Sequence, residues 1–172
     1  MADTLTHTIR ASINWTFREA LDLSNVNDAA TLEYSKDCAD GTSADQCDKI
    51  WHDQRVITTG ANDDLDLTAL TNSIFGSTVT INFVKVKSIL IVNTSTTAGD
   101  ELKLDSSVTN GFLGPFNGSN TSKIEIGPDS ACLLSSKKDG WAVTAGTGDI
   151  LRINNPNAGS VTYKIVIVGT SA

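Results

Sequence analysis

Polar and apolar residues alternate near the start of the chain. Between residues 7 and 17, every second position carries an apolar side chain: Ile9, Ala11, Ile13, Trp15 and Phe17. Successive side chains of a β-strand point to opposite faces, and β-branched and aromatic residues are enriched in strands. The alternation therefore predicts a half-buried strand over residues 7–17.

Residues 18–48 lack such a regular pattern. Their aspartates follow no fixed spacing: Asp22, Asp28, Asp37, Asp40, Asp45 and Asp48. Residues 35–45 also contain Ser, Gly and Thr, so this stretch has the composition of an exposed loop. We therefore expect residues 1–49 to form an N-terminal strand or arm together with a long acidic loop.

From residue 50 onward, short strand signals alternate with clusters of turn residues. The expected strands cover residues 50–57, 64–67, 78–83, 86–92, 101–104, 111–116, 123–126, 131–134, 141–143, 149–153 and 161–168. Residues 86–92 are almost continuously apolar, which predicts a central strand covered on both faces. Residues 67–74 lack strand alternation, so we expect a helical turn or a loop there.

Strands that recur every ~8–12 residues between turns indicate a β-sandwich or a barrel. No segment has the periodicity of a long helix, which excludes a doubly wound α/β fold. We therefore predict an all-β protein with a single jelly-roll-like β-sandwich over residues 50–172. The arm and the acidic loop of residues 1–49 precede it, and the length of 172 residues suits one compact domain.

The chain is acidic, since 20 Asp and Glu residues against 13 Lys and Arg residues give a net charge of −7. This charge repels phosphate backbones, so nucleic acid is not an expected partner. No apolar run approaches the ~20 residues of a membrane-spanning helix, so a membrane is not an expected partner either. The first residues lack the basic and apolar regions of a signal peptide, which predicts a protein made in the cytoplasm of its host cell.

The sequence contains no constellation that predicts an enzyme. Its histidines are His7 and His52. His52 precedes Asp53, but neighbours on a strand point to opposite faces and cannot form a catalytic relay directly. No Gly-x-Ser-x-Gly motif is present. We therefore expect no catalytic residues and no cofactor.

Metal-binding patterns are also sparse. The histidines and cysteines show no Cys-x-x-Cys or His-x-x-x-His spacing, so no zinc site is expected. We expect Cys38, Cys47 and Cys132 to be reduced, although Cys38 and Cys47 flank a polar loop and could pair in an oxidising medium. Calcium prefers oxygen ligands. Two acidic groups are candidates for it, with solvated turns as the alternative: Asp37, Asp40, Asp45 and Asp48, and Asp63, Asp64 and Asp66.

Residues 50–172 resemble a family of small proteins that are encoded among the structural genes of tailed bacteriophages. The resemblance is carried by residues 51–55 (WHDQR), 64–67 (DLDL), 84–94 (VKVKSILIVNT), 114–116 (GPF), 141–149 (WAVTAGTGD) and 161–172 (VTYKIVIVGTSA). These motifs are structural rather than catalytic, and residues 1–49 are not part of the resemblance.

The resemblance implies a head decoration (cement) protein with a jelly-roll-like sandwich. Such a protein is part of the virion, on the capsid surface, where a homo-oligomer, most often a trimer, reinforces contacts between subunits of the major capsid protein. We expect the apolar face of the N-terminal strand to contact the capsid or a neighbouring copy, through Ile9, Ile13, Trp15 and Phe17. The alternative function is a receptor- or carbohydrate-binding module of a phage fibre or tail, with its site in the loops.

Overall fold

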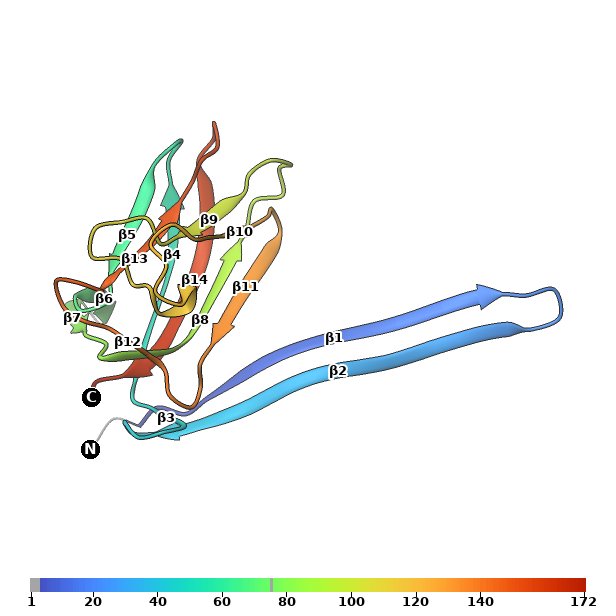
Figure 1. The fold of residues 1–172 in the computed structure, drawn as a ribbon, viewed down its shortest axis with the longest axis horizontal. Helices are drawn as coiled ribbons and strands as arrows, with labels where there is room; N and C mark the ends of the chain where they lie inside the picture. The colour runs from blue at the N-terminus through green and yellow to red at the C-terminus, as the bar shows by residue number, and fades with distance from the viewer. Residues whose placement is uncertain (1–3, 75) are drawn as a thin grey trace.

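Two facing β-sheets and one long hairpin make up the molecule (Figure 1). The computed structural model describes residues 4–74 and 76–172. The hairpin of β1 and β2, which we call the arm, projects far away from the two sheets. The strands from β4 to β14 form the sandwich, which we call the body.

The body contains two antiparallel sheets. The β5 sheet has the order β10-β9-β13-β5, with the bounds Lys123–Ile126, Leu102–Asp105, Ile150–Asn154 and Asn62–Asp66. The β4 sheet has the order β11-β8-β14-β4, with the bounds Ser130–Ser135, Lys85–Asn93, Val161–Thr170 and Lys49–Ile57. The short β12 (Trp141–Ala142) also pairs with β8.

The order of the strands is that of a jelly roll. Numbered along the chain without β6, β7 and β12, the strands of the β4 sheet follow the order sixth, third, eighth, first. Those of the β5 sheet follow the order fifth, fourth, seventh, second. Most connections therefore cross from one sheet to the other, as in a sandwich built from two Greek keys. The predicted all-β sandwich is confirmed.

The inner faces of the two sheets enclose one hydrophobic core. Both sheets contribute buried side chains: Trp51, Ile57, Ile89, Ile91, Ile165 and Ile167 from the β4 sheet, and Leu65, Leu102, Leu104, Leu151 and Ile153 from the β5 sheet. The indole Nε1 of Trp51 donates a hydrogen bond to the Thr71 carbonyl oxygen at 3.1 Å. β8 lies between β11 and β14, as its apolar sequence predicts, but Leu90 on its outer face remains exposed.

Two short segments of the body differ from the sequence predictions. Leu70–Ile74 is strand β6, not a helical turn or loop, and it pairs with β7 (Ser77–Ile81). The hairpin buries Leu70 and Ile81 but leaves polar residues between them exposed, which hides its strand pattern. Residues 111–116 end in a 3₁₀ helix, η1 (Gly114–Phe116), whose first turn contains a proline with a suitable fixed φ. Among the described residues, no helix is long and apolar enough to cross a membrane.

The arm is an antiparallel ribbon of two strands. β1 (His7–Ala20) pairs over its whole length with β2 (Asn25–Asp40), from His7 opposite Cys38 to the tip. At the end nearest the body, β2 also pairs in parallel with the short β3 (Gln46–Cys47). The arm therefore meets the body at one end only, which we call its root (Figure 1).

Two predictions about residues 1–49 are wrong in their details. The exposed loop expected over residues 35–45 is a strand as far as Asp40, because β2 pairs with β1 up to Cys38 and with β3 beyond it. β1 is not half-buried: beyond Ile9 its residues are exposed on both faces, because only β2 lies beside them. Residues 1–3 of the predicted arm lie outside the described residues.

Candidate functional site

The arm has one apolar and one polar face. Directly opposed residues of an antiparallel pair point to the same side of the ribbon. The register therefore places apolar residues of both strands on one face, which we call the apolar arm face: Ala11, Ile13, Trp15 and Phe17 of β1, and Val26, Ala30, Leu32 and Tyr34 of β2. Its centre is the pair of Ile13 and Leu32, which lie opposite each other.

The apolar arm face is open to solvent. Ile13 and Leu32 are each 69% exposed, and Phe17 is 61% exposed. Trp15 and Tyr34 are exposed to a smaller extent, and the Trp15 indole donates a hydrogen bond to Asp28 at 3.2 Å. Contiguous apolar surface of this kind marks a contact site in a soluble protein.

The polar arm face carries cross-strand hydrogen bonds. Thr8 donates to Asp37 at 2.7 Å, and Thr31 donates to Asn14 at 2.7 Å. Arg10 approaches Glu33 at 3.4 Å, although both side chains are largely exposed. Such contacts hold the two strands in register, but exposed pairs contribute little free energy. An isolated two-stranded hairpin without a third layer is at best marginally stable in water.

The root of the arm packs on the outer face of the β4 sheet. Ile9, Cys38, Cys47 and Val168 form a small buried cluster, against which Leu5, Leu133 and Val166 pack. Beside it, a groove lies between the arm and the sheet, lined by apolar and polar side chains of both: His7, Thr8, Ile9, Arg10, Ile50, Ser88, Leu90, Leu133, Val166 and Val168. The root of the arm and the outer face of the β4 sheet therefore share one partly apolar groove.

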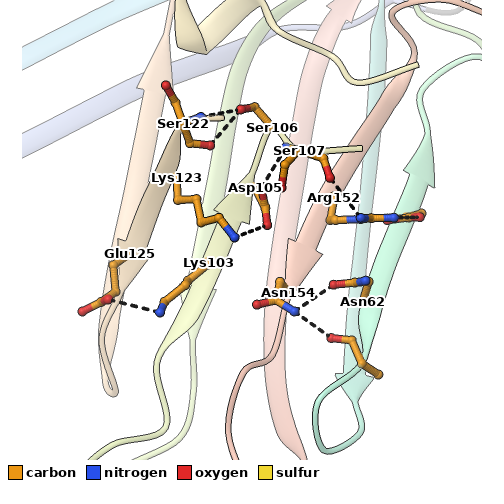
Figure 2. A network of polar contacts seen from close by, with 12 residues as sticks. Asn62, Lys103, Asp105, Ser106, Ser107, Ser122, Lys123, Glu125, Arg152 and Asn154 are labelled. Carbon is orange, nitrogen blue, oxygen red and sulfur yellow. Dashed lines mark hydrogen bonds and ion pairs between the residues drawn. The ribbon is translucent and has the colours of Figure 1, made fainter. Parts of the chain in front are cut away.

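The outer face of the β5 sheet is different, since it is covered by charged and polar pairs (Figure 2). Lys123 approaches Asp105 at 2.8 Å and Lys103 approaches Glu125 at 3.8 Å. The Arg152 guanidinium binds both carboxylate oxygens of Asp64 at 2.7 Å. Burial raises the pKa of Asp105, but hydrogen bonds from Lys123 and Ser107 outweigh it, so this pKa lies below its ordinary value. The outer face of the β5 sheet is therefore polar, as expected for a surface that faces water.

The acidic residues considered for calcium are held by separate protein donors. Asp63 accepts hydrogen bonds from Arg55 and from the Tyr163 hydroxyl, and Asp64 binds Arg152. The remaining ones also have their own partners: Asp66 with Thr68, Asp45 with Lys137, Asp48 with Ser171, Asp40 with the Leu5 amide, and Asp37 with Thr8. Within the described residues, neither acidic group brings three carboxylates together as a metal site.

His7, Cys38 and Cys47 converge at the root of the arm. Their potential ligand atoms all lie within 4.8 Å of one another, and both thiols are buried. Burial raises the pKa of Cys47 to about 12, with a further contribution from the neighbouring Cys38. Burial lowers the pKa of His7, and Lys137 lowers it further. With its pKa at this value, Cys47 is protonated at neutral pH and is therefore not a reactive nucleophile.

The four residues predicted as contacts fall into two groups. Ile9 is buried at the root, whereas Ile13, Trp15 and Phe17 lie exposed on the apolar arm face. Sequence reasoning missed the contribution of β2, because Asp28 and Lys36 interrupt its apolar positions. A signal was present, since residues 30, 32 and 34 are apolar or aromatic at a spacing of two. It also missed the cluster of His7, Cys38 and Cys47, whose members are distant in sequence.

A scan against protein-family models and a search of the curated proteins found no match to this chain.

Proposed function

We propose that this chain is a virion structural protein: a head decoration, or cement, protein that binds the outside of a phage capsid and reinforces contacts between major capsid subunits. The observation that carries the proposal is the arm, a long ribbon with an apolar face that nothing in the described chain covers. The resemblance of residues 50–172 to phage structural proteins supports the same function.

The length of the arm supports a role in bridging subunits. β1 has 14 residues, which at ~3.3 Å per residue gives an arm of about 46 Å. A ribbon of this length reaches well beyond the footprint of the sandwich (Figure 1). A protein that reinforces a shell has to contact more than one subunit, and a long arm provides the second contact.

We assign the apolar arm face to the surface of the major capsid protein. The apolar arm face is exposed, whereas the outer face of the β5 sheet is covered by ion pairs. In a decoration protein, the first surface lies against the shell and the second faces water. A homotrimer at a symmetry axis presents three such arms, so that modest contacts multiply across the shell.

The test is binding to capsids of the source phage that were assembled without this protein. In the arm-deleted variant, an Asn-Gly turn replaces residues 11–34. This two-residue turn connects Arg10 to Ser35, which face each other in the register. The root residues Ile9 and Cys38 remain. We expect this variant to keep the folded body and to lose capsid binding in a co-sedimentation assay.

Two outcomes would contradict the proposal. Capsid occupancy of the arm-deleted variant equal to that of the full chain would show that the arm is not the contact. Electron microscopy of the source particle that locates the protein on the tail or a fibre would overturn the head assignment in favour of the receptor-binding alternative. Density for the protein over the outside of the capsid would support the head assignment.

A further inference from the structure

Three strands each contribute one metal-binding side chain to the root of the arm. His7 is the first residue of β1, Cys38 lies opposite it on β2, and Cys47 ends β3. Because His7 and Cys38 are directly opposed, their side chains point to the same side of the ribbon. β3 pairs in parallel with the end of β2 and brings Cys47 to them.

The spacing of these atoms fits a tetrahedral zinc ion. The Nε2 atom of His7 lies 4.0 Å from the Sγ atom of Cys47. Zinc–nitrogen and zinc–sulfur bonds of the usual lengths place such atoms about 3.6 Å apart at a tetrahedral angle. The observed distance is too long for a strong hydrogen bond but needs only a small adjustment to bind an ion.

The imidazole has a second unusual feature. Its Nδ1 atom is buried and has no hydrogen-bond partner within residues 4–74 and 76–172. A buried polar atom without a partner costs free energy, so its position calls for another source of stabilisation. A metal ion bound through Nδ1 would supply one, whereas an ion bound through Nε2, the atom 4.0 Å from the Cys47 Sγ, would not. One imidazole and two thiolates form a donor set that suits zinc, whereas calcium and magnesium bind oxygen ligands.

We propose that His7, Cys38 and Cys47 bind one Zn²⁺ ion, which joins β1, β2 and β3 at the root of the arm. Three protein ligands leave a fourth tetrahedral position for water. This inference does not depend on the identity of the surface that the arm binds, so it can fail or hold independently of the proposed function.

The position of the site gives it a mechanical role. Within the described chain, the buried cluster at the root contains Ile9 and Val168 beside the two cysteines, and Leu5, Leu133 and Val166 pack against it. Load on the arm reaches the body through this root, because β1 pairs with no strand other than β2 in that part of the chain. Metal–ligand bonds to all three strands resist the separation of those strands more strongly than these few apolar contacts do.

The experiment uses the full-length chain purified under reducing conditions. We expect about one equivalent of zinc per chain by elemental analysis. After removal of the metal, titration with Co²⁺ should give the visible d–d bands of a tetrahedral ion and the near-ultraviolet band of cobalt bound to thiolate. Circular dichroism of the metal-free chain, recorded in parallel, shows whether the body stays folded.

The chain offers a matched control for each type of ligand. Cys47→Ser should weaken zinc binding more than about 100-fold, since the loss of even an outer-shell partner costs 10–100-fold. His7→Ala should also abolish the cobalt bands. Cys132→Ser and His52→Ala change the same residue types outside the cluster and should bind zinc like the unchanged chain.

Several results would overturn the proposal. One is a folded, reduced, unchanged chain that takes up neither zinc nor cobalt. Another is a Cys47→Ser variant with undiminished binding. A third is a single free thiol in the chain purified without reductant, together with a Cys38–Cys47 disulfide in its peptide map and no bound metal. The first and third use the unchanged chain, so they stay informative even if a variant fails to fold.

Discussion

Strands β1 and β14 both carry apolar residues at every second position, yet these apolar faces lie in opposite environments. In β14, Tyr163, Ile165 and Ile167 are at most 1% exposed, because the second sheet covers them. In β1, Ile13 and Phe17 are 69% and 61% exposed, because only β2 lies beside them. Alternation thus shows that a strand has an apolar face, but not whether the same chain covers that face.

The difference separates folding from binding within one chain. The apolar residues of the body contribute their burial energy when the chain folds. Those of the arm are exposed, so under the proposed function their burial energy is available for binding. Substitutions in the two regions should therefore affect different measurements.

The largest effect is expected for Trp51→Ala in the body. Trp51 is 1% exposed, and its Nε1 donates a hydrogen bond to the Thr71 carbonyl oxygen. Removal of a buried aromatic side chain leaves a cavity and costs about 3–5 kcal/mol. We expect this loss in the free energy of unfolding, measured by urea denaturation and followed by circular dichroism.

Phe17→Ala is the matched change in the arm. It removes an exposed aromatic side chain, so the free energy of unfolding should change by less than about 0.5 kcal/mol. A loss as large as that of Trp51→Ala would mean that the arm packs against the body in solution, and the distinction between the two regions would fail.

The next effect concerns binding by the arm. Ile13→Ser together with Leu32→Ser removes the opposed pair at the centre of the apolar arm face. Each side chain gains about 1.5–3 kcal/mol when fully buried, so the Kd for the capsid should rise at least about 100-fold. Co-sedimentation with capsids over a range of protein concentrations measures this change.

The control for this pair lies on the opposite face of the same ribbon. Ser12 and Glu33 are also directly opposed, but they belong to the polar arm face. Ser12→Ala together with Glu33→Ala should leave the Kd within about threefold of the unchanged chain. Equal losses for both double variants would show that binding does not select the apolar arm face.

The body was the more predictable region. Its strands are short, strongly β-prone and separated by turn residues, so the positions of β4, β8 and β14 follow from the sequence. The misses there have local causes: β6 has few apolar residues, and η1 begins beside a proline. The order of the strands in the two sheets could not be predicted, because it is set by contacts between residues far apart in the chain.

The structure of the arm was less predictable from the sequence. The strand at residues 7–17 was predicted, but its partner was not, because Asp28 and Lys36 interrupt the alternation of β2. In an exposed ribbon, such residues carry little desolvation cost, so the pattern need not be strict. The cluster of His7, Cys38 and Cys47 was missed because short-range spacing rules do not detect ligands that are brought together by strand pairing.

The smallest effect tests the polar outer face of the β5 sheet by acid. Asp105 is buried, and hydrogen bonds from Lys123 and Ser107 outweigh burial, so its pKa lies below the ordinary value of 3.8. A carboxyl group whose pKa is lowered by folding stabilises the folded state fully above its unfolded pKa. That stabilisation is lost as the pH falls below 3.8 towards the lower pKa of the folded state.

Asp105→Asn should therefore reduce the free energy of unfolding at pH 7 and have a smaller effect at the acidic end of the range. Urea denaturation at several pH values between 7 and 3 measures the difference between the two chains. Glu125→Gln, which removes an exposed partner of Lys103 in the same sheet, should give a difference close to zero throughout. If Asp105→Asn gave a loss independent of pH, its carboxylate would act through packing rather than charge. The outer face of the β5 sheet would then resemble the apolar surfaces more closely than its ion pairs indicate.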